Sequence, residues 1–343
     1  MRIALFRRGG ARSRQKFGVA VIALGMLTAC QPQFQSINGE TMGTYYLVRY
    51  GSAACTLEQT DIEARLTALN QSMSTYIADS ELMRINQGPA GSYPLSNDLA
   101  HVISAAIDLH GQTGGTLDIT IGPLVELWGF GAKNTGGLVP SIEEQQRVAA
   151  QVGVQHLELS DAGLFKANDD TTMDLSALAK GYAVDVLAGL ADSAGCQDYM
   201  VDIGGEIRVA GTNPKGTVWR VGIEVPEPDG LGGTQEVLLL TNAAVATSGD
   251  YRNFISVAGE RIDHILDPRS GLPATSAVVS STVVHSQAMF ADALATAFMV
   301  HEAQEAVRIA DALGVAVYLV TRDSGNHLQT VYNAAMKQYL DQP

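Results

Sequence analysis

Strand-like and helix-like stretches follow one another along this sequence without a regular order, and this irregularity limits the folds that the chain can adopt. A helical spacing of apolar residues extends over 57–70, 97–113, 141–151, 175–192, 288–300 and 303–313, whereas alternating apolar residues predict strands over 45–50, 199–225, 237–267 and 315–320. A doubly wound parallel fold needs a steady strand–helix–strand repeat, which this sequence lacks. We therefore predict an α+β fold, a single compact unit of two intimately packed α/β halves.

Asn97 and Ser141 stand at the predicted starts of two of these helices, and their side chains are expected to cap them. A glycine-rich stretch from Thr113 to Gly131 is expected to be a loop, with Trp128 in the core.

The first residues have the pattern of an export signal. Six basic residues precede an apolar run from Phe17 to Ala29, which is too short to cross a membrane as a helix, since crossing takes about 20 residues. The run ends in Leu-Thr-Ala-Cys at Cys30, which resembles a bacterial lipobox, although an ordinary secretory signal with a chance cysteine has the same pattern. We predict a lipoprotein signal peptide over 1–29, a lipidated tether over 30–39 and a folded domain over 40–343.

Charge and cysteine content indicate an exported, lipid-anchored protein. Loss of residues 1–29 removes six positive charges and no negative ones, so the formal net charge of −14 becomes −20. Nucleic acid is then excluded as a partner, because phosphate binding needs a basic face. We expect the protein on the periplasmic side of a bacterial membrane, and Gln31 indicates the outer membrane in a Gram-negative cell. Cys55 and Cys196 can form a disulfide there, but the sequence leaves their pairing open.

Several glycine-rich turns can hold a phosphate, although the common nucleotide-binding motifs are missing from the sequence. The candidates are Gly114-Gly115, Gly204-Gly205 and Ser248-Gly249, where backbone amides can approach an anion. Each of them taken alone is also consistent with a plain turn, because glycine is the usual residue at a positive φ.

Eight motifs, taken in order, carry a resemblance to a known family. They are ETMGTYY (40–46), MSTYIADSELMRIN (73–86), GGTLDITIGPLVELWGFG (114–131), DLSALAKGYAVD (174–185), VDIGGEIRVAG (201–211), ATSGDYRNF (246–254), DHILDPRSGLP (263–273) and ADALATAF (291–298). In sequence and order they resemble the ApbE family of flavin transferases. The resemblance covers residues 40–320 and implies a T-fold-related architecture with the flavin nucleotide in the cleft between two halves.

The resemblance also implies an activity. It is a magnesium-dependent transfer of the FMN moiety of FAD to a threonine or serine of an acceptor protein, forming a phosphoester bond and releasing AMP. Two alternatives stay open, namely a magnesium-dependent FAD pyrophosphatase that gives FMN and AMP, and a non-catalytic flavin-binding lipoprotein. Family precedent points to acceptors that are subunits of membrane redox complexes with a Ser/Thr-Gly-Ala-Thr-like motif.

The chain offers oxygen ligands for Mg²⁺, which prefers carboxylates, carbonyls and phosphates. Asp292 and Thr296 are four residues apart, so a helix places both on one face. The resemblance assigns both to the metal, together with a backbone carbonyl that we place at Ala179. Without the resemblance, a carboxylate near a helix N-terminus and a buried threonine are the simpler interpretation.

An acceptor hydroxyl loses a proton as it attacks phosphorus, so a nearby base accelerates transfer. His264 lies in a motif that the family shares, and the ordinary pKa of histidine suits this role, although a hydrogen-bonded loop histidine is an equally good interpretation. Asp267 can orient its ring or hold a second metal ion. Asp292 is the rival base, and the sequence does not separate the two.

Flavin binding is predicted from family motifs. Met42 and Tyr76 can pack on the aromatic rings, Asp118 can accept a hydrogen bond from the flavin ring or ribose, and Lys180 can approach the phosphates. For Met42 and Tyr76 a core position is the competing interpretation. The complete set predicted to bind FAD is Met42, Tyr76, Leu117, Asp118, Lys180, Asp185, Gly204, Gly205, Glu206, Ser248, Gly249, His264 and Ile265.

Overall fold

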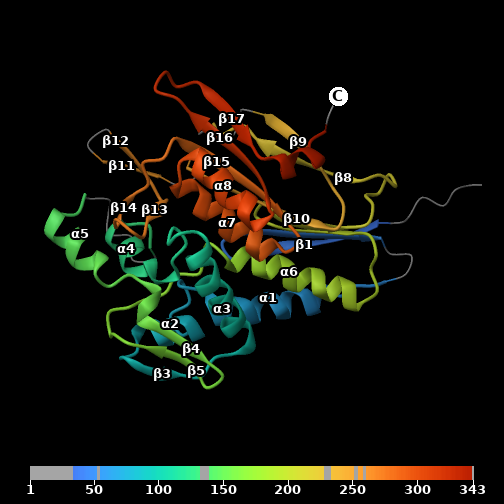
Figure 1. The fold of residues 1–343 in the computed structure, drawn as a ribbon. Helices are drawn as coiled ribbons and strands as arrows, with labels where there is room; N and C mark the ends of the chain where they lie inside the picture. The colour runs from blue at the N-terminus through green and yellow to red at the C-terminus, as the bar shows by residue number, and fades with distance from the viewer. Residues whose placement is uncertain are drawn as a thin grey trace, which may run out of the picture. The chain divides into compact units, whose positions relative to one another are not determined.

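An eight-stranded sheet, antiparallel at every pairing, is the framework of the structure (Figure 1). This computed structural model describes residues 34–51, 55–131, 139–227, 233–250, 254–257 and 260–341. Across the sheet the strands are β1 (Phe34–Thr41), β2 (Thr44–Gly51), β6 (Tyr199–Ile203), β7 (Glu206–Ala210), β10 (Ala243–Gly249), β15 (Val278–His285), β16 (Ala316–Arg322) and β17 (Leu328–Tyr332). Together with the helices below, this sheet confirms the predicted α+β class.

Helices cover one face of the sheet. The helices α6 (Ala179–Ser193) and α7 (Ala288–Val300) pack on the strands and on each other, and α1 (Gln59–Met73) packs on α6. Every residue of α7 except Phe290 and Thr296 is buried, as expected for a helix that is apolar all round. Thr296 is therefore one of two α7 side chains that reach past the packed core.

The opposite face of the sheet carries a second core, because successive strand residues point to opposite sides. In β16, Val317 and Leu319 belong to the core under the helices, whereas Tyr318 and Val320 belong to the second core. The second core is covered by the hairpin of β8 (Trp219–Glu224) and β9 (Thr234–Leu240) and by the short helix η3 (Ala334–Gln338).

Smaller elements complete the described chain. The remaining helices are α2 (Glu81–Gln87), α3 (Asn97–Gln112), η1 (Ile119–Ile121), α4 (Gly122–Leu127), α5 (Ile142–Ala149), η2 (Val154–His156) and α8 (Ala303–Leu313). The remaining strands are β3 (Gly91–Tyr93), β5 (Gly163–Lys166) and β4 (Leu157–Ser160) in one sheet, and two pairs, β11 (Phe254–Val257) with β12 (Glu260–Asp263) and β13 (Leu266–Asp267) with β14 (Leu272–Pro273).

Local sequence signals predicted some elements accurately. The helices over 288–300 and 303–313 are confirmed, and Ser141 caps α5 in a reciprocal capping box with Glu144. Trp128 is buried, as predicted, and its indole nitrogen donates to the carbonyl of Gly271 at 3.0 Å.

Other predictions were wrong in position. Ser96, not Asn97, caps α3 by accepting from the amide of Leu99, and α6 begins at Ala179 instead of residue 175. The stretch over 113–131 contains η1 and α4 and is not all loop, and residues 34–39 of the predicted tether belong to β1. The predicted signal peptide over 1–29 and the lipidation site at Cys30 lie outside the described residues.

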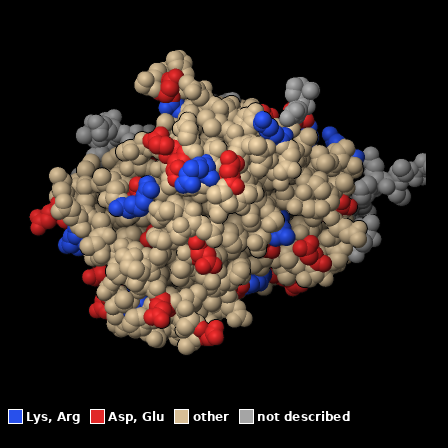
Figure 2. All heavy atoms as spheres, viewed as in Figure 1, with Lys and Arg blue, Asp and Glu red and all other residues tan. Residues whose placement is uncertain are grey.

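Acidic and basic side chains are interspersed on the face in Figure 2, which has no continuous basic patch. Within the ranges that the structure describes, no helix is both long enough and apolar enough to span a bilayer.

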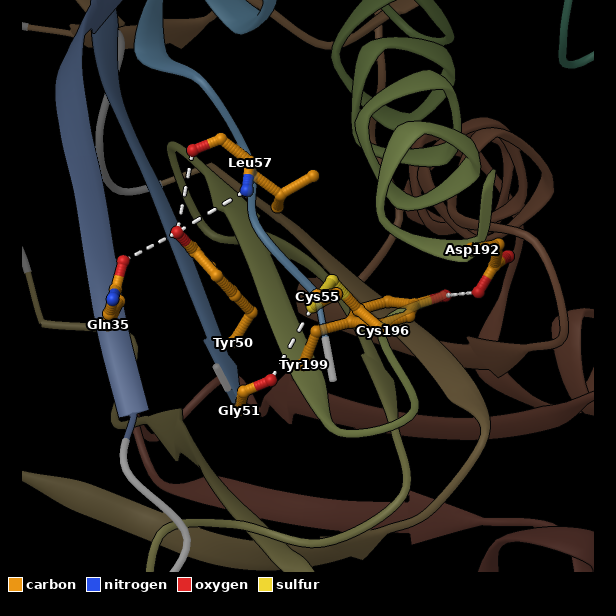
Figure 3. The surroundings of a disulfide bond; sticks show 8 residues. All are labelled: Gln35, Tyr50, Gly51, Cys55, Leu57, Asp192, Cys196 and Tyr199. Atoms are coloured by element: carbon orange, nitrogen blue, oxygen red, sulfur yellow. Dashed lines mark hydrogen bonds between the residues drawn. A yellow bond between two sulfur atoms is a disulfide. The ribbon is translucent and has the colours of Figure 1, made fainter. Parts of the chain in front are cut away.

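A disulfide joins Cys55, which follows β2, to Cys196, which follows α6 (Figure 3). Their Cα atoms are 5.2 Å apart although the residues are 141 positions apart in the sequence. Tyr50 and Tyr199 lie beside the bond, and their hydroxyls donate to Gln35 and Asp192, both at 2.8 Å. The disulfide therefore ties the N-terminal strand pair to the end of a core helix.

The paired substitution Cys55→Ala and Cys196→Ala is expected to lower the free energy of unfolding by about 2–4 kcal/mol, because it releases a long closed loop in the unfolded chain. Urea unfolding without reductant measures the loss. A reductant should reproduce the loss in the unsubstituted protein and leave the variant unchanged. An equal unfolding midpoint for both proteins would contradict the pairing.

Candidate active site

Asp292 lies where α6 and α7 meet, and its side chain is almost fully buried. Its Oδ2 accepts a hydrogen bond of 3.0 Å from the backbone amide of Gly181, in the first turn of α6. A Cβ atom at Gly181 would collide with the carbonyl oxygen of Ala288 at the start of α7. Glycine at this position therefore allows the two helices to approach closely enough for the Asp292 contact.

This contact changes the backbone hydrogen bonding at the start of α6. In an α-helix the amide of Gly181 would donate to the carbonyl of Ala177, four residues earlier. Because that amide donates to Asp292 instead, none of the described hydrogen bonds ends on the Ala177 carbonyl, whereas the carbonyl of Leu178 accepts from Tyr182. A backbone oxygen of Ala177 is thus left without its helical partner next to the Asp292 contact.

The same contact bears on the carbonyl ligand predicted at Ala179, which stays a prediction. Ala179 is the first residue of α6, and helix geometry directs its carbonyl to the amide of Ala183. Ala177 is the better candidate for a carbonyl ligand.

Lys180 joins two buried carboxylates. Its Nζ lies 2.8 Å from Oε1 of Glu206 and 3.8 Å from Oδ1 of Asp292. The other oxygen of Glu206, Oε2, is buried and has no hydrogen-bond partner among the described residues. With both carboxyls ionised, the cluster Lys180–Glu206–Asp292 has one net negative charge.

Burial controls the protonation of both carboxyls. Burial and then the charge of Asp292 raise the pKa of Glu206 to about 7, although the Lys180 ammonium opposes the shift. Burial also raises the pKa of Asp292, against the Lys180 ammonium and the Gly181 amide. A bound cation would offset the cost of holding both groups ionised.

Thr296 lies one turn after Asp292 in α7, which places the two side chains on one face as predicted. Its Oγ1 is 3.0 Å from the hydroxyl of Ser248 in β10. The predicted residues Asp292, Thr296, Lys180, Glu206 and Ser248 therefore line one side of the α6–α7 junction. Gly204 and Gly205 both have positive φ angles, and they form the tight turn between β6 and β7, which begins at Glu206.

His264 follows β12, and its partly exposed ring meets the edge of Phe130 at a centroid distance of 6.3 Å. The next residue, Ile265, is buried and accepts from the amide of Ala274 at 2.8 Å. Burial tends to raise the pKa of the Asp267 carboxyl, but the hydrogen bonds from Arg269 outweigh burial and lower this pKa. The Asp267 carboxylate is bound by Nε and Nη2 of Arg269, both at 2.9 Å, so it is a partner of Arg269 and not the expected partner of His264.

Asp185 and Asp118 have structural partners at both carboxylate oxygens. Asp185 accepts from Arg208 at 2.7 Å and from the first two amides of α7, those of Ala288 and Met289, both at 2.9 Å. It therefore fixes the N-terminus of the helix that carries Asp292.

In the same way, Asp118 accepts from the amide and the hydroxyl of Thr120 and from the amide of Val154, and so holds its loop in place. For both aspartates these contacts give a positioning role, while the predicted FAD contact stays a prediction.

The remaining predicted flavin-binding residues stay predictions as well. Met42 has a φ of 50° in the turn between β1 and β2, Tyr76 is 73% exposed, and Leu117 is buried. A large exposed aromatic ring such as that of Tyr76 is available for stacking.

Sequence reasoning missed Arg208 and Ala177. Arg208 lies two positions after Glu206 in β7, so a strand places both on one face, and this signal was present in the sequence. Ala177 had no such signal, because its free carbonyl results from a contact between two distant helices.

The donor set suits a hard cation better than a transition metal. In the part of the chain that the structure describes, no group of three or more His, Cys, Asp or Glu side chains is placed to hold a metal. Magnesium commonly uses one or two carboxylates and takes its other ligands from hydroxyls, carbonyls, water and substrate phosphates. Asp292, Thr296 and the Ala177 carbonyl fit that pattern.

The comparisons with known proteins agree with this architecture. The chain is 40% identical over 311 residues to a FAD:protein FMN transferase of Vibrio cholerae, an alignment that covers 89% of this chain and 93% of the relative. A FAD:protein FMN transferase of Haemophilus influenzae is 39% identical over 338 residues, covering 94% and 97% of the two chains.

Solved structures of flavin transferases share the fold. The Vibrio cholerae flavin transferase ApbE superposes with a TM-score of 0.82 at 38% identity over 90% of this chain and 99% of that one. The Pseudomonas stutzeri flavinyl transferase ApbE gives 0.83 at 34% identity over 91% and 98%. The sequence model of the ApbE family matches residues 42–319. This chain belongs to the ApbE family.

The substitution Gly181→Ala is expected to lower the free energy of unfolding by about 1–3 kcal/mol, because the new methyl group forces α6 and α7 apart. Thermal unfolding measures this effect. The matched control is Gly189→Ala in the same helix, where no atom lies within 4 Å of the new Cβ and stability should stay equal or rise by up to about 1 kcal/mol. Equal losses at both positions would contradict the close helix contact.

Loss of the proton from Glu206 is expected to make the metal-free protein less stable as the pH rises. Its pKa is raised from an ordinary 4.5 to about 7, so the stability from the bound proton is fully present below pH 4.5 and is lost as the pH rises through 7. Glu206→Gln should flatten this slope in urea unfolding at several pH values with EDTA present. An unchanged slope would show that another group titrates.

Proposed function

We propose that this chain transfers the FMN moiety of FAD to a threonine or serine hydroxyl of an acceptor protein and releases AMP. The buried cluster of Asp292, Lys180 and Glu206 beside Thr296 is the observation that carries the proposal. An ammonium group that can bind a phosphate there lies beside oxygen atoms that can bind a cation. Relatives that match about nine-tenths of the chain are FAD:protein FMN transferases.

We assign the Mg²⁺ site to the carboxylate of Asp292, the hydroxyl of Thr296 and the carbonyl of Ala177. When bound, the cation supplies positive charge to the phosphate oxygens of FAD and to the leaving AMP. Two features of the described residues support a cation here. With both carboxyls ionised, the cluster is one negative charge in excess, and the buried Oε2 of Glu206 has no partner among them.

The residues of the chain then have distinct tasks. Lys180 binds a phosphate oxygen, and the turns at Gly204-Gly205 and Ser248-Gly249 bring backbone amides towards the nucleotide. Met42, Tyr76, Leu117 and Ile265 provide apolar and aromatic contacts for the flavin and adenine rings.

In the transfer step the acceptor oxygen bonds to the FMN phosphorus, and the bond from that phosphorus to the oxygen of AMP breaks. The acceptor proton passes to a base, and AMP leaves with the bonding electron pair. We assign the base to His264, because Asp292 is buried, accepts from the Gly181 amide and is engaged as the cation ligand. His264 has a partly exposed ring and lies in a turn at the surface.

Hydrolysis of FAD to FMN and AMP uses the same phosphate site, with water in place of the acceptor hydroxyl. A flavin-binding lipoprotein without turnover would need neither the buried cluster nor the base. The measurements below separate these two alternatives from the transferase.

We propose that the protein works on the periplasmic side of a bacterial membrane, anchored by a lipid on Cys30 after removal of residues 1–29. The disulfide between Cys55 and Cys196 supports an oxidising compartment, since such bonds are rare in the cytosol. The acceptor would be a subunit of a membrane redox complex on the same side.

The test of the function is the intact mass of an acceptor domain with a Ser/Thr-Gly-Ala-Thr motif after incubation with residues 31–343, FAD and Mg²⁺. We expect a mass gain of one FMN, which EDTA or an alanine at the acceptor threonine abolishes. Release of AMP without a mass gain would indicate a pyrophosphatase, and neither product would indicate a binding protein.

Asp292→Asn is expected to reduce magnesium-dependent AMP release by at least about 100-fold, because the neutral amide is a poor ligand for Mg²⁺. The rate is measured by AMP release over a range of Mg²⁺ concentrations, with a melting temperature as the folding control. Unchanged activity would remove Asp292 from the metal site.

His264→Ala is expected to slow transfer by about 10²- to 10⁴-fold while changing the affinity for FAD little, because a base acts in the chemical step. Single-turnover transfer and flavin fluorescence measure the two quantities. A loss confined to affinity would make His264 a binding residue.

A further inference from the structure

A cavity of about 480 Å³ lies between the β13–β14 turn and the junction of α7 and α8. Arg269, Thr275 and Ser276 line one side of it, and His301 and Glu302 line the other. Its size is within the usual range of ligand sites. None of the residues that we predict to bind FAD lines this cavity, so the proposed nucleotide site leaves it without a function.

The cavity is close to the proposed catalytic residues. A small second hollow shares Ala274 and Ser276 with it and is also lined by Asp263 and Ile265, the two neighbours of His264. The amide of Ala274 donates to the carbonyl of Ile265 at 2.8 Å, which fixes the cavity wall to the turn that carries His264.

The helix α7 connects the cavity to the proposed metal site from the other side. Val300 lines the cavity at the end of α7, eight residues after Asp292 and four after Thr296. At 1.5 Å per residue, the cavity wall is about 12 Å along the helix from Asp292 and about 6 Å from Thr296. The hydroxyl of Ser276 donates to the carbonyl of Met299 at 2.6 Å and holds the two walls together.

The charge of the lining is unfavourable for a second phosphate-bearing ligand. Asp267, Glu302 and Glu305 contribute three carboxylates against the one basic lining residue, Arg269. The Arg269 guanidinium is already bound to Asp267 through two nitrogens. The negative phosphates of a nucleotide would therefore be repelled by the lining, whereas a neutral or basic polypeptide would not be repelled.

The other lining groups suit a polypeptide chain. Thr275 provides a hydroxyl on an exposed rim, and a hydroxyl can both donate and accept, as a peptide backbone requires. Leu272, at the same rim, is 41% exposed and offers an apolar contact to a side chain.

We infer that this cavity binds the segment of the acceptor protein that flanks its reactive hydroxyl, an inference that rests on the proposed transferase function. An extended chain advances about 3.3 Å per residue, so about four residues span the 12 Å from the cavity to the level of Asp292. The cavity then determines which hydroxyl reaches the FMN phosphorus.

The test is Thr275→Trp, which fills the cavity from an exposed position without removing a described hydrogen bond. The probe is the acceptor domain with the Ser/Thr-Gly-Ala-Thr motif, and transfer is followed by intact mass at several acceptor concentrations. We expect KM for the acceptor to rise at least tenfold, with FAD affinity by fluorescence within twofold of the unsubstituted protein. Thr67→Trp, on the exposed face of α1, is the matched control and should change neither quantity.

The possible outcomes are distinct. Unchanged acceptor kinetics in Thr275→Trp would overturn the inference, and an equal loss of FAD affinity would assign the cavity to the nucleotide. Should the tryptophan variant fail to fold by melting temperature, Thr275→Gln replaces it under the same criteria. Absence of transfer by the unsubstituted protein would instead refute the proposed function itself.

Discussion

The hydrogen bond from the Gly181 amide to Asp292 is the contact on which the rest of the site depends. It forms only because glycine lets α6 approach the start of α7, and Asp185 fixes that start by accepting from its first two amides. Because the Gly181 amide donates to Asp292, it does not donate to the Ala177 carbonyl, which is left without its usual helical partner. Two helices that pack on one antiparallel sheet thereby fix the Asp292 carboxylate at the first turn of α6, with Thr296 on the same face of α7.

The charges of the buried cluster make this site suited to a cation. Two buried carboxylates and one ammonium leave one negative charge in surroundings where ionisation is costly, so the pKa values of Glu206 and Asp292 rise. A divalent cation would offset the negative charge of such a cluster and of a pyrophosphate bound beside it.

Features that depend on local sequence were predictable, whereas those that depend on distant contacts were not. The spacing of Asp292 and Thr296 predicted their shared helix face, and Ser141 predicted the start of α5, where it forms a capping box. Other features could be predicted only with knowledge of which segments meet in space. They are the Ala177 carbonyl without a helical partner, the Cys55–Cys196 disulfide and the ion pair between Asp267 and Arg269. The family resemblance predicted the fold correctly, whereas the carbonyl ligand that we placed at Ala179 stays a prediction and Ala177 is our proposal in its place.

The central claim, that this helix junction holds the catalytic cation, is tested most directly by anomalous scattering from Mn²⁺ in crystals of the protein with FAD. The account predicts one strong peak at about 2–2.3 Å from the Asp292 carboxylate, the Thr296 hydroxyl and the Ala177 carbonyl, in contact with the FAD phosphates. A peak that contacts the Ala179 carbonyl would contradict the assignment of the third ligand. A peak away from Asp292 would contradict the site as a whole.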